Sequence, residues 1–346
     1  MRARLLVTLA LCMSALTACG PGALVPETTE PPSTTGSAAN IDRQVGWGSE
    51  LALVRGQNLV ALELDRRHEA TEALDVVERA RVEAERLSSR AGGRAQSSFA
   101  RLMRALQDAA DALERPDPAR DLDQALGAAG RATLQIESDL VGPTRDTTAY
   151  RASVVAALVN VDCPFAYEAA IELDRADLLS NYRLAYGCLR EAANLHAGLS
   201  TVLEENTDDR ARATQVMLAS MFKAMPEAVP PEDLAPLDEV RAAAYMLGAL
   251  LAEQYGVPAP PPADRLGFIS SLLEEVLTTY ESGEAGVADV LLEQVRADLC
   301  CPQTSVGTSL EDELAALSRA IRSGAADDEV AALVEEAIDL AEAAAG

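Results

Sequence analysis

The sequence predicts an all-α protein, and three observations support this fold class. No stretch alternates apolar and polar residues as a half-buried strand would, and no Asn-Gly or Asp-Gly pair marks a hairpin. Leucine, alanine and valine recur at helical spacing over charged faces through most of the chain. Aromatic residues make up only 3% of the sequence, which favours a core of aliphatic side chains on helices.

The first 18 residues have the parts of a secretory signal. Arg2 and Arg4 form a short positive segment. The apolar run from Leu5 to Ala15 is too short to span a bilayer, which takes about 20 residues. We therefore interpret residues 1–18 as a signal peptide that is removed on export.

The four residues Leu16-Thr17-Ala18-Cys19 resemble the lipobox of bacterial lipoproteins. In that family the cysteine thiol is acylated, and cleavage just before it makes the cysteine the first mature residue. The resemblance implies a diacylglyceryl thioether on Cys19, often with an N-acyl chain such as palmitate, and two or more chains give stable anchoring. Gly20, in place of an acidic residue, implies the outer membrane where a cell has two. An ordinary secreted protein is the alternative.

The net charge of the chain is −26, and it becomes −28 once the leader with its two arginines is removed. Nucleic acid and anionic lipid repel such a surface, so neither is an expected partner. The lipid anchor therefore has to supply the attachment to the membrane. We expect a location in the bacterial cell envelope, with the body facing the periplasm or the cell surface and an envelope protein as partner.

Changes in composition divide the mature chain into segments. Residues 19–45 carry Pro, Thr, Ser and Gly but few large apolar residues, so we expect a disordered stalk behind the lipidated cysteine. Two helical bundles are expected next, the first of which could also be a coiled-coil hairpin. The expected ranges are 46–142 and 143–255 for these bundles, 256–264 for a proline-rich linker and 265–346 for C-terminal helical hairpins.

Individual helices follow from apolar periodicity and its breaks. One helix is expected from Ser49, as N-cap, to about Arg90, with Gly92 and Gly93 in the turn after it. A proline ends another helix at Pro164. The remaining helices are expected at about 96–115, 120–140, 148–161, 164–174, 178–199, 208–225, 233–255, 265–282, 284–299, 309–322 and 326–344.

Four cysteines remain in the mature chain, and an exported protein meets an oxidising compartment. Four cysteines allow three pairings. Cys163 and Cys188 lie nearly symmetrically about a turn near Asp174, so an antiparallel hairpin would bring them level. We favour a Cys163–Cys188 bridge with a strained vicinal Cys300–Cys301 pair. A metal-binding cysteine cluster is the alternative.

Catalytic signatures are scarce, and we expect a protein that is not an enzyme. The sequence has no Gly-rich phosphate loop, no HExxH and no Gly-x-Ser-x-Gly. His68 and Glu72 stand four residues apart, a spacing that puts both on one helix face as a metal site needs. Acidic residues are so frequent that a solvated helix face is the simpler interpretation.

The stretch from Val159 to Leu195, "VNVDCPFAYEAAIELDRADLLSNYRLAYGCLREAANL", resembles the helical periplasmic module of bacterial high-affinity iron permeases. The last helical hairpin resembles the end of the same module. The resemblance implies an iron site, and hard carboxylate and phenolate oxygens suit ferric iron. Its ligands would be Asp162, Tyr167, Glu168, Glu172 and Tyr182.

The sequence also departs from that family. Asn181 stands where the family has an acidic residue, and "ADLCCPQ" replaces a Phe-Glu-rich stretch. Two functions therefore remain open. The first is a lipid-anchored binding or scaffold protein linked to uptake of iron or another metal. The second is a purely structural envelope protein that acts through its N-terminal helices.

Overall fold

The computed structural model describes residues 35–115, 118–172, 175–200, 208–259, 266–299 and 305–345. Every regular element in these ranges is a helix, which confirms the all-α fold class. The lipobox cysteine Cys19, most of the expected stalk, Cys300 and Cys301 lie outside the described residues. The division into domains stays a prediction.

The first four helices form a closed bundle. They are α1 (Thr35–Arg66), α2 (Ala70–Ala91), α3 (Gln96–Leu113) and α4 (Ala119–Val141), and each packs against the next, with α4 returning to α1. In α2, buried side chains recur every three or four residues, as in Ala80, Ala84 and Leu87. Gly92 then ends α2 in the left-handed conformation, with φ 59°.

The helix α1 also carries the next layer of the molecule. A 3-10 turn, η1 (Gly142–Asp146), leads into α5 (Thr148–Ala157), the π-helical turn η2 (Leu158–Asp162), α6 (Cys163–Glu172) and α7 (Arg175–Ser200). Both α5 and α7 pack on α1, on the side away from α2. The helices α8 (Asp208–Ala224) and α9 (Leu237–Tyr255) follow, and α9 contacts α5 and α6.

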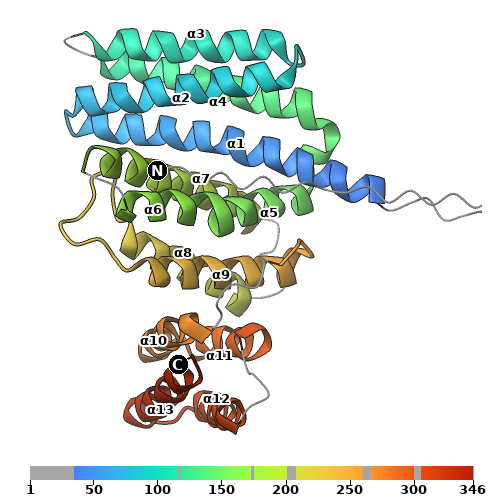
Figure 1. Ribbon diagram of the computed structural model, residues 1–346, viewed down its shortest axis with the longest axis vertical. Coiled ribbons are helices and arrows are strands. Elements are labelled where there is room, and N and C mark those ends of the chain that lie inside the picture. Colours follow the sequence, from blue (N-terminus) through green and yellow to red (C-terminus); the bar gives the residue numbers. More distant parts are fainter. Residues whose placement is uncertain are drawn as a thin grey trace, which may run out of the picture.

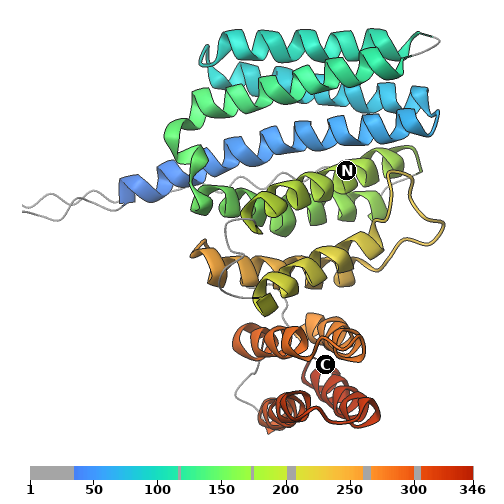
Figure 2. The same cartoon turned by 180° about the vertical axis from the view of Figure 1, so that it is seen from behind.

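The last helices form a second closed group. They are α10 (Leu266–Glu281), α11 (Ala285–Gln294) with the π-helical turn η3 (Val295–Leu299), α12 (Ser305–Ser323) and α13 (Asp327–Ala345). This group touches the rest of the body through α9 and α8. Figure 1 and the reverse view in Figure 2 show the layers stacked along the long axis, with α1–α4 at one end and α10–α13 at the other.

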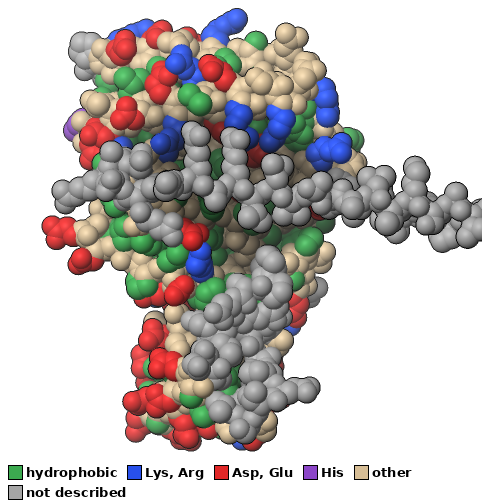
Figure 3. All heavy atoms as spheres, in the orientation of Figure 1, with side chains coloured by type: hydrophobic (Ala, Val, Ile, Leu, Met, Phe, Trp, Pro, Cys, Tyr) green, Lys and Arg blue, Asp and Glu red, His purple; other side chains and the backbone are tan. Residues whose placement is uncertain are grey.

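Charge is distributed unevenly along this axis. The segment 266–345 contains 17 Asp or Glu residues and only three Arg residues. On the face seen in Figure 3, Lys and Arg side chains gather over the α1–α4 end, whereas Asp and Glu dominate the α10–α13 end. The two ends of the body therefore present different electrostatic surfaces.

The uninterrupted helix expected from Ser49 to Arg90 is wrong. The helix α1 begins at Thr35, inside the expected stalk, and Ser49 lies within it and is no N-cap. A turn separates α1 from α2, and His68 adopts a positive φ of 65° in it. Because His68 is in this turn and Glu72 is in α2, the two residues do not share a helix face as the spacing predicted.

The helix break expected at Pro164 is also wrong. The N–H of Cys163 donates to the Leu158 carbonyl five residues earlier, which makes η2 a π-type turn. A proline in an ordinary α turn presses its ring onto the carbonyl four residues before it, and the wider turn accommodates the ring without ending the helix. The helical stretch Thr148–Ile171 is thus continuous.

This stretch is the one helix in the described ranges that is long and apolar enough to cross a membrane. Within its qualifying window, 56% of the residues are buried inside the body. The helix contacts α1, α7 and α9, which surround it as they would a core helix. Length and composition alone therefore give weak evidence for a membrane span here.

The backbones of α1 and α7 touch at two glycines. A Cβ atom built on Gly187 would lie 2.9 Å from the carbonyl carbon and oxygen of Gly56, and one built on Gly56 would overlap the Gly187 carbonyl. Both obstacles are backbone atoms, so a side-chain movement cannot relieve them. Glycine at these two positions sets the closest approach of the two layers.

We predict that Gly56→Ala lowers the free energy of unfolding by about 1–3 kcal/mol, because the added methyl group forces α1 and α7 apart. The measurement is urea unfolding followed by circular dichroism. Gly130→Ala in α4 is the matched control, since a Cβ there meets nothing within 4 Å. That control should stabilise the protein by about 0.5–1 kcal/mol. A Gly56→Ala protein as stable as the parent would contradict the close approach.

Candidate functional site

The structure brings the two tyrosines of the expected iron site together in the core. Tyr167 on α6 and Tyr182 on α7 are fully buried, and their ring centroids are 6.3 Å apart. The Tyr167 hydroxyl donates to the Ala235 carbonyl at 2.9 Å. Burial raises the pKa of Tyr167 to about 12 and also raises the pKa of Tyr182. Burial therefore makes the phenolate form, which ferric iron takes, harder to reach for both tyrosines.

The expected carboxylate ligands are engaged elsewhere. Glu168 forms an ion pair with Arg241 at 2.8 Å, and Asp162 lies beside Ser49 and Glu50 of α1. The Glu172 side chain lies outside the described part of the structure. Among the described residues, no group of three or more His, Cys, Asp or Glu side chains could hold a metal ion. The described members of the expected set thus do not form one site.

Asp162 is a partly buried carboxyl group at the end of the π-helical turn. Burial, together with the nearby Glu50 charge, raises its pKa to about 6, although a hydrogen bond with the Ser49 side chain acts in the opposite direction. The folded state therefore holds a proton on Asp162 at pH values where the unfolded chain has already released it.

We predict that this proton makes stability fall as pH rises. The folded pKa of about 6 lies above the model-peptide value of 3.8, so the stabilising contribution is complete below about pH 4 and lost as pH passes 6. Asp162→Asn should therefore gain about 1–3 kcal/mol relative to the parent between pH 4 and pH 7. Urea unfolding across this range measures the difference. The exposed Asp75→Asn control should follow the parent, and an Asp162→Asn curve parallel to the parent would refute the assignment.

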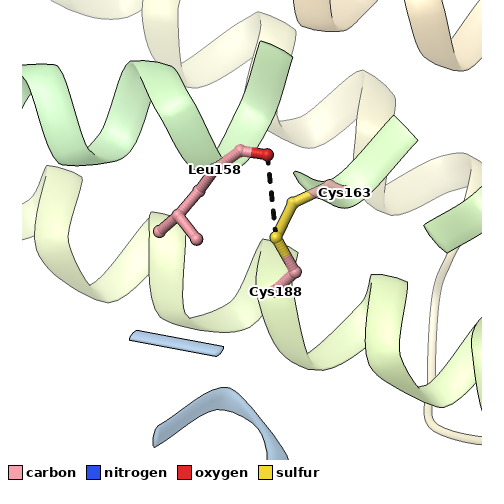
Figure 4. The surroundings of a disulfide bond; sticks show 3 residues. All are labelled: Leu158, Cys163 and Cys188. Atoms are coloured by element: carbon pink, nitrogen blue, oxygen red, sulfur yellow. Dashed lines mark hydrogen bonds between the residues drawn. A yellow bond between two sulfur atoms is a disulfide. The ribbon is translucent and has the colours of Figure 1, made fainter. Parts of the chain in front are cut away.

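The disulfide favoured from the sequence is present. Cys163 at the start of α6 is bonded to Cys188 in α7, with the Cα atoms 5.5 Å apart across a sequence separation of 25 (Figure 4). The carbonyl oxygen of Leu158 lies 3.7 Å from the Cys188 sulfur. A disulfide sulfur carries no proton to donate, so we treat this as a close contact. The bridge fastens the π-helical turn to α7.

A buried charge cluster joins four helices around Arg55 of α1. The Arg55 guanidinium donates to Glu191 of α7 and, at 3.1 Å, to Glu137 of α4. Tyr150 of α5 donates its hydroxyl to the other oxygen of Glu137 at 2.9 Å. All four residues are buried. Sequence reasoning missed this cluster, because its members come from distant segments and no local spacing marks them.

Burial alone would lower the pKa of Arg55, but the charges of Glu191 and Glu137 outweigh it and raise that pKa. Burial and the Glu137 charge raise the pKa of Tyr150 as well. The cluster therefore consists of one cation, a neutral phenol and two acidic groups around the cation. Each member depends on the others, since an unpaired buried charge is costly.

We predict that Arg55→Met lowers the free energy of unfolding by about 3–5 kcal/mol, because it leaves two buried carboxyl groups without their cation. Urea unfolding at pH 7 measures the loss. Arg86→Met on exposed α2 surface is the control and should change stability by less than about 0.5 kcal/mol. Adding Glu137→Gln and Glu191→Gln to Arg55→Met should recover most of the loss. A stable Arg55→Met protein would contradict a structural role of the cluster.

A polar pocket opens between α1, α2 and α7. It has a volume of about 360 Å³, and its buried polar lining residues are Gln57 and Arg183, which are 4% and 8% exposed. The Oε1 atom of Gln57 and the Nε atom of Arg183 have no hydrogen-bond partner in the described structure. The other lining residues are Glu72, Asp75, Val76, Arg79, Leu179, Ser180 and Leu184. Sequence reasoning missed this pocket, because it combines residues from three separate helices.

No protein-family model matches the chain, and neither the curated proteins nor the solved structures contain a match to it.

Proposed function

We propose that this chain is a lipid-anchored, non-catalytic binding protein of the bacterial cell envelope. The observation that carries the proposal is the position of Cys19, between an apolar leader and a stretch rich in Pro, Thr and Ser. Lipidation there would hold the body on the membrane, which its negative charge could not do. The Cys163–Cys188 disulfide supports export, because disulfides persist in oxidising compartments.

The pocket between α1, α2 and α7 favours a binding role over a purely structural one. Arg183 is buried there without an ion-pair partner among the described residues. A buried charge without a partner lowers the stability of the fold, so a purely structural role does not explain it. The structural alternative, through the N-terminal helices, has less support. The exposed large apolar side chains that the structure describes in α1–α4 are Ile41, Val82 and Leu134, and each lies on a different helix.

A role in iron uptake also has less support than binding as such. The Glu168 carboxylate is paired with Arg241, and the hydroxyl of Tyr167 is bonded to a backbone carbonyl. Both groups would have to leave these partners before they could bind a metal ion. The pocket between α1, α2 and α7 is therefore the stronger candidate for a ligand site.

We predict that Cys19→Ser abolishes incorporation of an alkyne-labelled palmitate and moves the protein from the membrane fraction to the soluble fraction. The reason is that the acyl chains are the expected membrane attachment. Labelling of the full chain in a bacterial host, followed by fractionation, measures both effects. Cys12→Ser is the matched control and should keep the label, because Cys12 leaves with the signal peptide. A parent protein that takes up no label would refute the lipid anchor.

A further inference from the structure

The guanidinium group of Arg183, on α7, is a buried cation in the pocket between α1, α2 and α7. Its side chain lines the pocket, is 8% exposed and forms no ion pair with any described residue. The Nε atom has no acceptor in the described ranges either. A buried guanidinium in this state is costly unless an anion meets it. The pocket therefore offers its strongest interaction to a negatively charged group such as a carboxylate.

Beside Arg183, Gln57 contributes an acceptor from α1. Its Oε1 atom is buried, and no described residue donates a hydrogen bond to it. A ligand group that satisfies both side chains must supply an acceptor to Arg183 and a donor to Gln57. Inorganic anions that carry no proton supply only the first, so the chemistry of these two side chains favours an organic molecule with both kinds of group.

The more exposed side of the pocket carries charge of both signs. Glu72 is partly buried and Asp75 is exposed, and neither forms an ion pair with a described residue. Arg79 donates to the Ser180 carbonyl at 3.0 Å in the same wall. The four charged side chains sum to zero, with an arginine as the most buried of them and a carboxylate at the rim. Such an arrangement is complementary to a molecule with separated opposite charges.

We propose that this pocket binds a small zwitterion of the amino-acid class. The carboxylate of the ligand accepts from Arg183, and its ammonium group donates to Gln57 and faces Glu72 and Asp75. The pocket volume of about 360 Å³ lies within the range of small-molecule sites. Val76, Leu179 and Leu184 supply apolar surface for an aliphatic side chain of the ligand. This inference rests on the proposed function, because it names the ligand class of that binding protein.

The test is calorimetric titration of the full mature protein in detergent with each of the twenty proteinogenic amino acids. For the tightest of them, the N-acetyl derivative lacks the ammonium group and the carboxamide derivative lacks the carboxylate. We expect each derivative to bind at least tenfold more weakly. Equal affinity for the N-acetyl derivative would indicate a simple anion site and overturn the proposal, as would no binding of any amino acid.

Variants locate the site. Arg183→Met and the pair Glu72→Gln with Asp75→Asn should each weaken binding at least tenfold, whereas Arg86→Met on the exposed surface of α2 should leave it unchanged. Without amino acid, Arg183→Met should unfold at the same temperature as the parent or higher, because it removes an unpaired buried charge. A lower melting temperature would mean that the fold satisfies Arg183, and would overturn the proposal.

The two experiments distinguish failure of the lipid anchor from failure of the ligand class. If the parent protein takes up palmitate but binds no amino acid, the proposed ligand class is refuted and the lipid anchor is supported. If it binds an amino acid but takes up no palmitate, the lipid anchor is refuted and the proposed pocket is supported.

Discussion

The contact between α1 and α7 at Arg55 and Gly56 constrains the rest of the body. Gly56 lets the two backbones touch, and the neighbouring Arg55 forms ion pairs with Glu191 on α7 and Glu137 on α4. An ion pair satisfies its partners over a narrow range of geometry, whereas aliphatic packing tolerates small shifts. The cluster therefore fixes the register of α1 against both of its neighbouring layers, and the aliphatic side chains fill the space that this register leaves.

The same helix explains why the pocket is where it is. Two positions beyond Arg55, Gln57 carries a buried Oε1 atom that has no donor among the described residues. The helix α7 shows the same contrast, because Glu191 is paired with Arg55, while the Nε atom of Arg183 has no partner in the described part of the chain. On each of the two helices, a side chain that is paired within the fold therefore lies near one that reaches the pocket with a polar atom lacking a partner among the described residues. Unsatisfied polar groups in a pocket are typical of binding sites, where stability is given up locally for recognition.

Much of the helical framework could be predicted from the sequence, because apolar periodicity and Gly or Pro punctuation are local signals. The helices from α7 to α13 begin and end within a few residues of expectation, and the Cys163–Cys188 bridge follows from hairpin symmetry. The turn at His68 could not be predicted, since no glycine or proline marks it. The helix through Pro164 was missed because a π-helical turn has no local sequence rule.

The polar sites were beyond sequence reasoning for a different physical reason. Arg55 and Glu191 are separated by 136 positions, and only the packing of α1 on α7 makes them partners. In a chain this rich in charged residues, composition cannot tell which few carboxylates and guanidinium groups are buried. The tyrosines show the converse: their chemistry suggests iron, but burial keeps the pKa of Tyr167 near 12 and turns both rings into core side chains. Burial and pairing together therefore decide whether a polar residue here serves the fold, and both are properties of the assembled layers rather than of any local motif.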